Sequence, residues 1–437
     1  MSYNLSDWHP EDNEYWSKKA KFIANRNLFS SIPCLLLAFS VWFIWSAVVV
    51  KLNSIGFNFT TEQLFRLTAM PGITGATLRI FYSFCVPIFG GRNWTVFSTA
   101  TLLIPAIGIG IAVQDTNTSY NTMIVLAILC GFGGGNFSSS MSNISFFFPK
   151  RFQGTALGLN AGLGNLGVST LQFVVPVVIY FGFFEFITGC PQEFIVNGKI
   201  ERIWLQNAAY FWVIPVVLAT ISAFIFMDNL PTAKASLKEQ MVIFKRKHMY
   251  IVTWLYVMSF GSFIGYSAAF PLLIKTQFPD VNPLRYAFLG PMVGALIRPV
   301  GGWISDKVKS GALITFVDLF VMIFAVLGVI YFISPGSKSF YGFFLMFILL
   351  FTTTGVANGS VFQMIPMIFP PKESAVVLGF SAAIAAYGAF LIPQSFGTSI
   401  KLTGGPEFAL YCFEIYYVTC LIITWWYYLR ANAEVKC

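Results

Sequence analysis

The stretch GATLR at residues 75–79 recurs as GALIR at residues 294–298. Each copy places one arginine, Arg79 or Arg298, inside a long run of apolar residues. The two copies are separated by about half of the chain, as expected for an internal duplication. The repeat predicts a chain built from two halves that share the same order of structural elements.

Two further pairs of motifs support the duplication, and both lie where a helix is expected to begin or end. Proline marks such a boundary because it lacks an N–H group and disfavours the helical conformation of the residue before it. The pairs are Phe148-Pro149 with Phe369-Pro370, and Leu157-Gly158 with Leu378-Gly379.

The composition around these motifs is that of a membrane protein. Hydrophobic residues make up 56% of the chain and charged residues only 10%. A helix that crosses a bilayer needs roughly 20 mostly apolar residues. The sequence therefore predicts an all-α membrane protein with about twelve transmembrane helices. The apolar runs lie at residues 32–51, 62–90, 94–113, 120–148, 152–181, 205–228, 248–274, 283–305, 312–333, 340–369, 373–400 and 406–430.

Two six-helix halves joined by a basic linker are the predicted organisation. We expect an N-terminal tail at residues 1–31, a first half at 32–228, a linker at 229–247, a second half at 248–430 and a C-terminal tail at 431–437. Lys and Arg are concentrated on the side of the membrane that carries the termini, so both termini are expected in the cytoplasm. A parallel six-plus-six repeat is the layout of the major facilitator fold, in which substrate binds at the membrane midplane between the halves.

The residue inventory disfavours several other classes of protein. The seven cysteines show no C-x-x-C spacing and only two histidines occur, so a metal centre or a catalytic triad has too few candidate residues. The G-x-G-x-x-G pattern at residues 162–167 lies in an apolar run and does not follow a strand, so it does not indicate a dinucleotide site. The net charge of +9 is attributed to cytoplasmic loops. We expect no enzymatic activity, no cofactor, no metal and no nucleic-acid partner.

The two repeated arginines are the main functional signal. An arginine near the middle of a membrane helix costs roughly 2.5–3.5 kcal/mol on insertion scales. One interpretation is a structural pair with a carboxylate, but the helical acids Asp318 and Glu414 have no counterpart in the other half. The other interpretation is an anion site. The planar guanidinium group further favours a planar oxyanion, because it donates two parallel N–H groups.

A glycine-rich region supplies the next candidates. Glycines are frequent at residues 131–135 and 154–167, where they can simply allow close packing of helices. Alternatively, bare backbone around Gly164 and the amide of Asn165 line a small cavity. An amide donates a hydrogen bond to an oxyanion without adding charge.

Aromatic residues are expected to form the walls of such a site. Tyr256 and Phe260 are four residues apart and hence share one helix face, and Phe137 directly follows the first glycine run. Ring faces and edges enclose a planar anion while the Tyr256 phenol donates a hydrogen bond. The alternative is that these rings face lipid or pack against other helices.

The run NISFFFP at residues 143–149, followed by GLNAGLGNLG at 158–167, closely resembles the nitrate/nitrite porter family of the major facilitator superfamily. GFNFTT at 56–61 and KTQFPD at 275–280 add to the resemblance, which covers nearly the whole chain. Within that family, the sequence resembles in particular the bacterial NarK-type nitrate/nitrite antiporters. The alanine-rich stretch at 379–390 departs from the family's glycine-rich pattern, which leaves the packing of helix eleven open.

The resemblance implies transport of nitrate and nitrite across the bacterial inner membrane by a chain that we expect to be a monomer surrounded by lipid. It also implies the substrate-binding residues, which are Arg79, Arg298, Asn165, Phe137, Tyr256 and Phe260. Two like charges at an empty site resist closure and one bound anion screens them, so nitrate/nitrite exchange is predicted. A proton-coupled nitrate symporter, an anion channel and a nitrate-sensing receptor are the alternatives.

Overall fold

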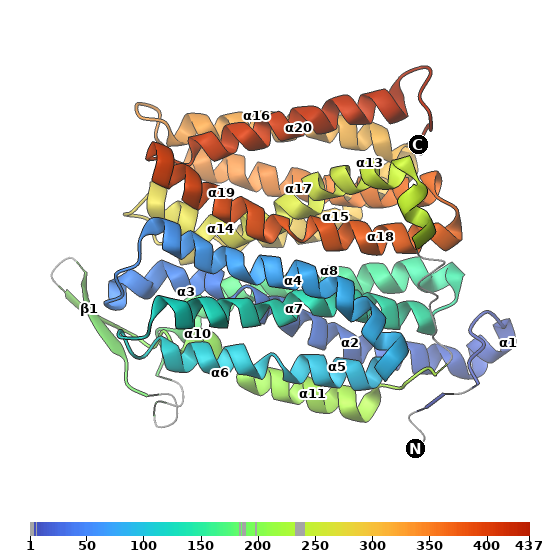
Figure 1. Ribbon diagram of the computed structural model, residues 1–437, viewed down its shortest axis with the longest axis horizontal. Helices are drawn as coiled ribbons and strands as arrows, with labels where there is room; N and C mark the ends of the chain where they lie inside the picture. The colour runs from blue at the N-terminus through green and yellow to red at the C-terminus, as the bar shows by residue number, and fades with distance from the viewer. Residues whose placement is uncertain (1–3, 6, 183–184, 186–188, 197–198, 232–240) are drawn as a thin grey trace. The chain divides into compact units, whose positions relative to one another are not determined.

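The computed structural model describes residues 4–5, 7–182, 185, 189–196, 199–231 and 241–437 (Figure 1). Within these residues, 12 helical segments are long and apolar enough to span a membrane. The prediction of twelve transmembrane helices is therefore confirmed. The chain divides into two compact units: Met1–Phe59 with Met70–Ser236, and Thr60–Ala69 with Leu237–Cys437.

The first unit contains the helices of the first half and a β-hairpin. In chain order, the elements are α1 (Asn13–Tyr15), η1 (Trp16–Ala20), α2 (Lys21–Trp42), α3 (Ile44–Leu52), η2 (Asn53–Ile55), α4 (Thr61–Phe89, whose first residues belong to the second unit), α5 (Gly91–Ala100), α6 (Leu103–Ala112), α7 (Tyr120–Phe147), α8 (Lys150–Val178), β1 (Gln192–Val196), β2 (Lys199–Ile203), α10 (Asn207–Tyr210) and α11 (Val213–Phe226). Helix α2 packs against both α7 and α8.

The first helix begins well before the apolar run that marks it in the sequence. Asp12 caps its first turn by accepting hydrogen bonds from the backbone of Glu14 and Tyr15. The polar stretch is nevertheless amphipathic, because Trp16 is buried in an apolar cluster that includes Phe148. Burial of this face explains why residues 13–31 are helical although their average polarity suggests a loose tail.

The hairpin of β1 and β2 is the one β-sheet among the described residues, and the sequence analysis did not predict it (Figure 1). Its strands are antiparallel, with Glu193 opposite Arg202. The Arg202 Nε atom lies 2.8 Å from a Glu193 carboxylate oxygen. The hairpin was missed because both strands are short and carry charged and apolar residues without a clear period of two.

The second unit repeats the helical order of the first. Its elements are η3 (Met241–Lys245), α13 (Lys247–Tyr256), η4 (Val257–Gly261), α14 (Ser262–Gln277), η5 (Pro283–Arg285), α15 (Leu289–Val308), α16 (Gly311–Ile333), α17 (Phe340–Ile368), α18 (Pro371–Ala385), α19 (Gly388–Thr403), α20 (Glu407–Thr424) and η6 (Trp425–Leu429). Helix α17 packs extensively against both α15 and α16.

In each unit, glycine brings the helix that carries the repeated arginine into backbone contact with a neighbouring helix. A Cβ atom at Gly134 of α7 would lie 2.6 Å from the Cα atom of Gly75 in α4. A Cβ atom at Gly359 of α17 would lie 2.4 Å from the carbonyl oxygen of Arg298 in α15. Neither approach leaves room for a side chain. These contacts fix the position of both arginines relative to α7 and α17.

Candidate functional site

Arg79 is fully buried in the first unit, with 0% of its surface exposed. Its Nε atom donates a hydrogen bond of 3.0 Å to the carbonyl oxygen of Gly134. Its guanidinium carbon lies 4.6 Å from the centre of the Phe137 ring and 5.3 Å from that of the Trp42 ring. The carbonyl group and the two rings stabilise the buried cation.

Phe137 is held in position by its own contacts. The ring is 4% exposed and packs edge-on against Phe39 of α2, with ring centres 6.1 Å apart. A ring fixed by packing keeps its face toward the guanidinium group. The structure therefore brings together Arg79 and Phe137, two of the residues predicted from the sequence.

Arg298 has a similar environment in the second unit, but it is only half-buried. Its guanidinium carbon lies 4.6 Å from the centre of the Phe362 ring. One of its terminal nitrogens donates a hydrogen bond of 3.4 Å to the Tyr256 hydroxyl. Among the described residues, no carboxylate forms an ion pair with Arg298.

The hydrogen bond between Arg298 and Tyr256 has a chemical consequence. The arginine is donor-only, so the phenol oxygen must be the acceptor in this bond. This bond therefore does not use the hydroxyl proton of Tyr256. An anion beside Arg298 would meet both guanidinium N–H groups and a phenolic O–H group, which are the donors that an oxyanion requires.

Tyr256 and Phe260 lie at a local change in helix geometry. Helix α13 ends at Tyr256 and is followed by the π-helical segment η4, which contains Phe260. The two rings are stacked with centres 5.8 Å apart and an interplanar angle of 18°. Single π-helical turns inside helices occur frequently at functional sites because they redirect side chains. Gly261 in η4 also lies against the backbone of Ala385, where an added Cβ would be 3.0 Å from the carbonyl oxygen.

The packing of Gly261 accounts for the alanine-rich helix eleven. Close approach between two helices requires a small residue on only one of them at each contact. Gly265 of α14 makes the next contact, where an added Cβ would lie 2.4 Å from the Gly388 carbonyl oxygen. Glycines on η4 and α14 thus allow the close approach to helix eleven, although Ala385 on that helix has a side chain.

Asn165 and Gly164 are adjacent on α8 but have different surroundings. Asn165 is 2% exposed, and its Oδ1 atom has no hydrogen-bond partner among the described residues. A buried amide oxygen without a partner is unusual in a folded protein. Gly164 packs on α2, because a Cβ atom there would lie 2.6 Å from side-chain carbons of Leu35. Their participation in substrate binding remains a prediction.

The two acids considered as structural partners of the arginines do not form such pairs. Asp318 is 8% exposed on α16, and Glu414 lies on α20. Within the part of the chain that the structure describes, neither acid belongs to an ion pair. Pairing of either arginine with one of these carboxylates is thereby excluded for this structure.

Two residues around the arginines were missed in the sequence, namely Trp42 and Phe362. Phe362 was overlooked because the repeat offset that relates Arg79 to Arg298 does not relate Phe137 to Phe362. A signal was present, however. Each ring follows by three residues a glycine that contacts the arginine-bearing helix, in GGNF at 134–137 and GSVF at 359–362. Trp42 had no distinguishing pattern within its apolar run.

Comparison with a family model and with solved structures shows the class of protein to which this chain belongs. The model of the family described as "Major Facilitator Superfamily" matches residues 31–393. A solved D-xylose-proton symporter has a TM-score of 0.68 at 14% identity, covering 92% of this chain and 97% of that chain. A bacterial homologue of the human lysosomal transporter Spinster has a TM-score of 0.66 at 14% identity, covering 90% and 95%. These similarities confirm the predicted major facilitator fold.

Relatives with higher sequence identity identify the family within this superfamily. "Nitrate/nitrite transporter NarU" of Escherichia coli (strain K12) is 49% identical over 458 residues, which cover 99% of this chain and 98% of the relative. "Probable nitrate/nitrite antiporter NarK2" of Thermus thermophilus is 44% identical over 441 residues, which cover 99% and 98%. The chain therefore belongs to the nitrate/nitrite porter family of the Major Facilitator Superfamily, as the resemblance of its motifs predicted.

Proposed function

We propose that this protein transports nitrate and nitrite across the bacterial inner membrane by alternating access. The observation that carries the proposal is the environment of Arg298, a membrane-embedded cation that contacts a phenol and an aromatic ring. Membrane arginines are retained where they bind a charged group, since they are otherwise costly. The relatives named as nitrate/nitrite transporters support nitrate and nitrite as the anions.

We further propose that Arg79 and Arg298 are the substrate-binding residues. Each guanidinium group would donate to the oxygens of the planar anion, and Phe137, Phe362 and Phe260 would present ring edges or faces to it. Tyr256 would add its phenolic hydrogen. Asn165 would donate through its amide nitrogen, and the Gly164 backbone would border the ion.

Exchange of nitrate for nitrite is the proposed mode of coupling. Two guanidinium charges repel one another, and the repulsion grows as water leaves the site. One bound monovalent anion lowers that repulsion, so only the loaded carrier is expected to change conformation. A carrier of this kind exchanges one anion for another and needs no proton.

The experiment is counterflow into proteoliposomes that contain the purified protein. Labelled nitrate should enter nitrite-loaded vesicles much faster than empty ones, and a pH gradient should have no effect. Equal uptake into empty vesicles, driven by the pH gradient, would replace exchange with proton symport. Uptake that does not saturate with nitrate would indicate a channel. The absence of any flux, with nitrate binding retained, would indicate a receptor.

Orientation and subunit number belong to the same proposal, in which a monomer has both termini in the cytoplasm. Cys190 is exposed just before the β-hairpin, on the loop that this topology places outside the cell. A membrane-impermeant maleimide should therefore label Cys190 in intact spheroplasts. Cys130, which is buried, is the internal control. If Cys190 were labelled only after lysis, this loop would lie in the cytoplasm, and the proposed orientation would be wrong.

A further inference from the structure

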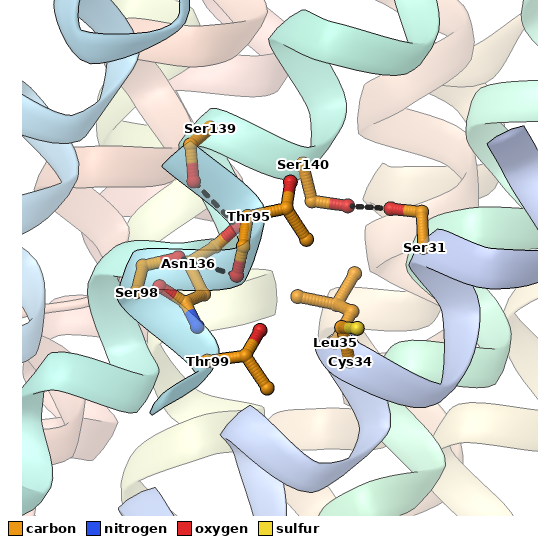
Figure 2. A pocket seen from close by; sticks show the side chains of 9 residues that line it. All are labelled: Ser31, Cys34, Leu35, Thr95, Ser98, Thr99, Asn136, Ser139 and Ser140. Atoms are coloured by element: carbon orange, nitrogen blue, oxygen red, sulfur yellow. Dashed lines mark hydrogen bonds between the residues drawn. The ribbon is translucent and has the colours of Figure 1, made fainter. Parts of the chain in front are cut away.

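A small cavity lies in the first unit, between α2, α5 and α7 (Figure 2). Its volume is ≈ 10 Å³, measured as room for water-sized spheres. None of the predicted substrate-binding residues lines it. The lining residues are Ser31, Cys34, Leu35, Thr95, Ser98, Thr99, Asn136, Ser139 and Ser140.

Most of the lining hydroxyl groups already form hydrogen bonds within the protein. A hydroxyl hydrogen that is donated to a backbone carbonyl leaves only oxygen lone pairs for the cavity. These bonded groups therefore present acceptors to the cavity, whereas the Thr99 hydroxyl and the Asn136 amide nitrogen are donors, and no lining residue carries a charge. The bonds are Ser31 to Ser140 at 2.8 Å, Thr95 to the Gly91 carbonyl at 2.8 Å, Ser98 to the Thr95 carbonyl at 3.4 Å and Ser139 to the Asn136 carbonyl at 3.2 Å.

Two of the lining residues have a buried polar atom without a hydrogen-bond partner among the described residues, namely Oδ1 of Asn136 and Oγ1 of Thr99. Asn136 is 5% exposed and Thr99 is 0% exposed. Figure 2 shows the Asn136 amide and the Thr99 hydroxyl turned toward the same space. Buried polar groups in folded proteins are bonded to protein or to ordered water. A hydrogen-bond donor is therefore expected beside Asn136.

We propose that this cavity is a binding site for a single ordered water molecule. The water would donate one hydrogen to Asn136 Oδ1 and interact through its other hydrogen and its lone pairs with the lining hydroxyls. An enclosed water needs about 10–15 Å³ of such room and two to four polar partners, and the cavity meets both conditions. Nitrate has four heavy atoms and would meet no charged group in this small space, so it is a poor occupant.

The position of the site gives the water a structural role. Asn136 directly precedes Phe137, whose ring lies 4.6 Å from the Arg79 guanidinium carbon. The water would hydrogen-bond to Asn136, in the turn of α7 that carries this ring, and would link that turn to α2 and α5. The assignment of the cavity does not depend on which anion the protein transports, so the two can fail separately.

X-ray radiolytic labelling with mass spectrometry tests the proposal on the full-length protein in nanodiscs. A bound water generates hydroxyl radicals beside the side chains that it touches. Cys34 lines the cavity and is 2% exposed, whereas Cys130 is 0% exposed and lies outside it. Cys34 should be oxidised several times faster than Cys130. Equal rates would overturn the proposal.

Two substitutions sharpen the test. Asn136→Leu removes the acceptor and fills the space, so the oxidation rate of Cys34 should fall to that of Cys130. Thr99→Val changes the volume very little and keeps the test valid should the Leu variant fail to fold; it should slow Cys34 oxidation severalfold. Thr101→Val is the matched control, because the Thr101 hydroxyl bonds to the Ser98 carbonyl and does not line the cavity. An unchanged rate in Thr99→Val would overturn the proposal.

A cation is the other occupant that neutral oxygen atoms could bind. Replacing sodium by choline should leave the thermal stability of the protein and the Cys34 rate unchanged. A sodium-dependent rise in melting temperature that Thr99→Val abolishes would show a cation site and overturn the assignment to water.

Discussion

The guanidinium carbon of Arg298 lies 4.6 Å from the centre of the Phe362 ring, and Arg79 has the same separation from Phe137 in the other unit. Both rings come from the helix against which the arginine-bearing helix packs through glycine. The two halves thus stabilise their membrane-embedded cations in the same way. The two rings occupy different positions in the sequence repeat. The arrangement around the cation is therefore more similar between the two halves than their sequences are.

Phe362 is predicted to contribute to nitrate affinity. Phe362→Leu keeps the apolar volume and removes the ring face, and such a cation–π contact is worth about 0.5–2 kcal/mol. Nitrate affinity should fall by a factor of about 2–30, since about 1.4 kcal/mol corresponds to tenfold. Calorimetric titration of the purified variant measures the change. Phe324→Leu is the control, because Phe324 is 62% exposed on α16; an equal loss in both variants would contradict a specific role.

Tyr256 is predicted to act through its hydroxyl group and not only through its ring. Tyr256→Phe retains the stacking with Phe260 but removes the O–H group that is proposed to donate to the anion. A hydrogen bond to a charged group contributes about 1.5–3 kcal/mol, so nitrate should bind about 10–150 times more weakly. Tyr331→Phe is the matched change at an exposed position. Wild-type affinity in the Tyr256 variant would leave only the ring as functional.

Both repeated arginines are predicted to depend on the shape of their side chains. Arg79→Lys and Arg298→Lys keep the charge but lose the paired N–H groups that match two coplanar oxygens. Exchange and nitrate binding should each fall at least about tenfold in either variant, because charge-assisted paired bonds are strong and directional. Arg66→Lys, on the same helix as Arg79 and partly exposed, should behave like wild type. Normal binding in both substrate-arginine variants would place the site elsewhere.

Gly359 is predicted to be a packing residue that no other amino acid can replace. An added Cβ would lie 2.4 Å from the Arg298 carbonyl oxygen, and backbone cannot move aside as a flexible side chain does. Gly359→Ala should therefore destabilise the protein by about 1–3 kcal/mol. At Gly379 an added Cβ meets nothing within 4 Å, so Gly379→Ala should leave stability unchanged or slightly raised. Thermal unfolding in detergent compares the two, and a similar melting temperature for both would refute the packing argument.

The sequence alone determined the fold class, because bilayer thickness and backbone hydrogen bonding leave apolar runs of this length few alternatives to spanning helices. It also identified the two arginines, since a charge inside such a run stands out against its surroundings. Helix ends agreed closely wherever proline or a polar cluster marked them. The N-terminal start at Asn13 was missed because its helix is amphipathic rather than uniformly apolar.

Only the tertiary structure decided which groups surround each charge. Phe362 is 64 residues from Arg298 in the chain, and Gly134 is 55 residues from Arg79. Their proximity arises from helix packing, which depends on the shapes of both surfaces. The same holds for the cavity beside Asn136, whose walls come from three helices. The spacing of apolar residues in the sequence indicates which face of one helix is buried. Contacts between two helices depend on how their backbones pack in the folded protein.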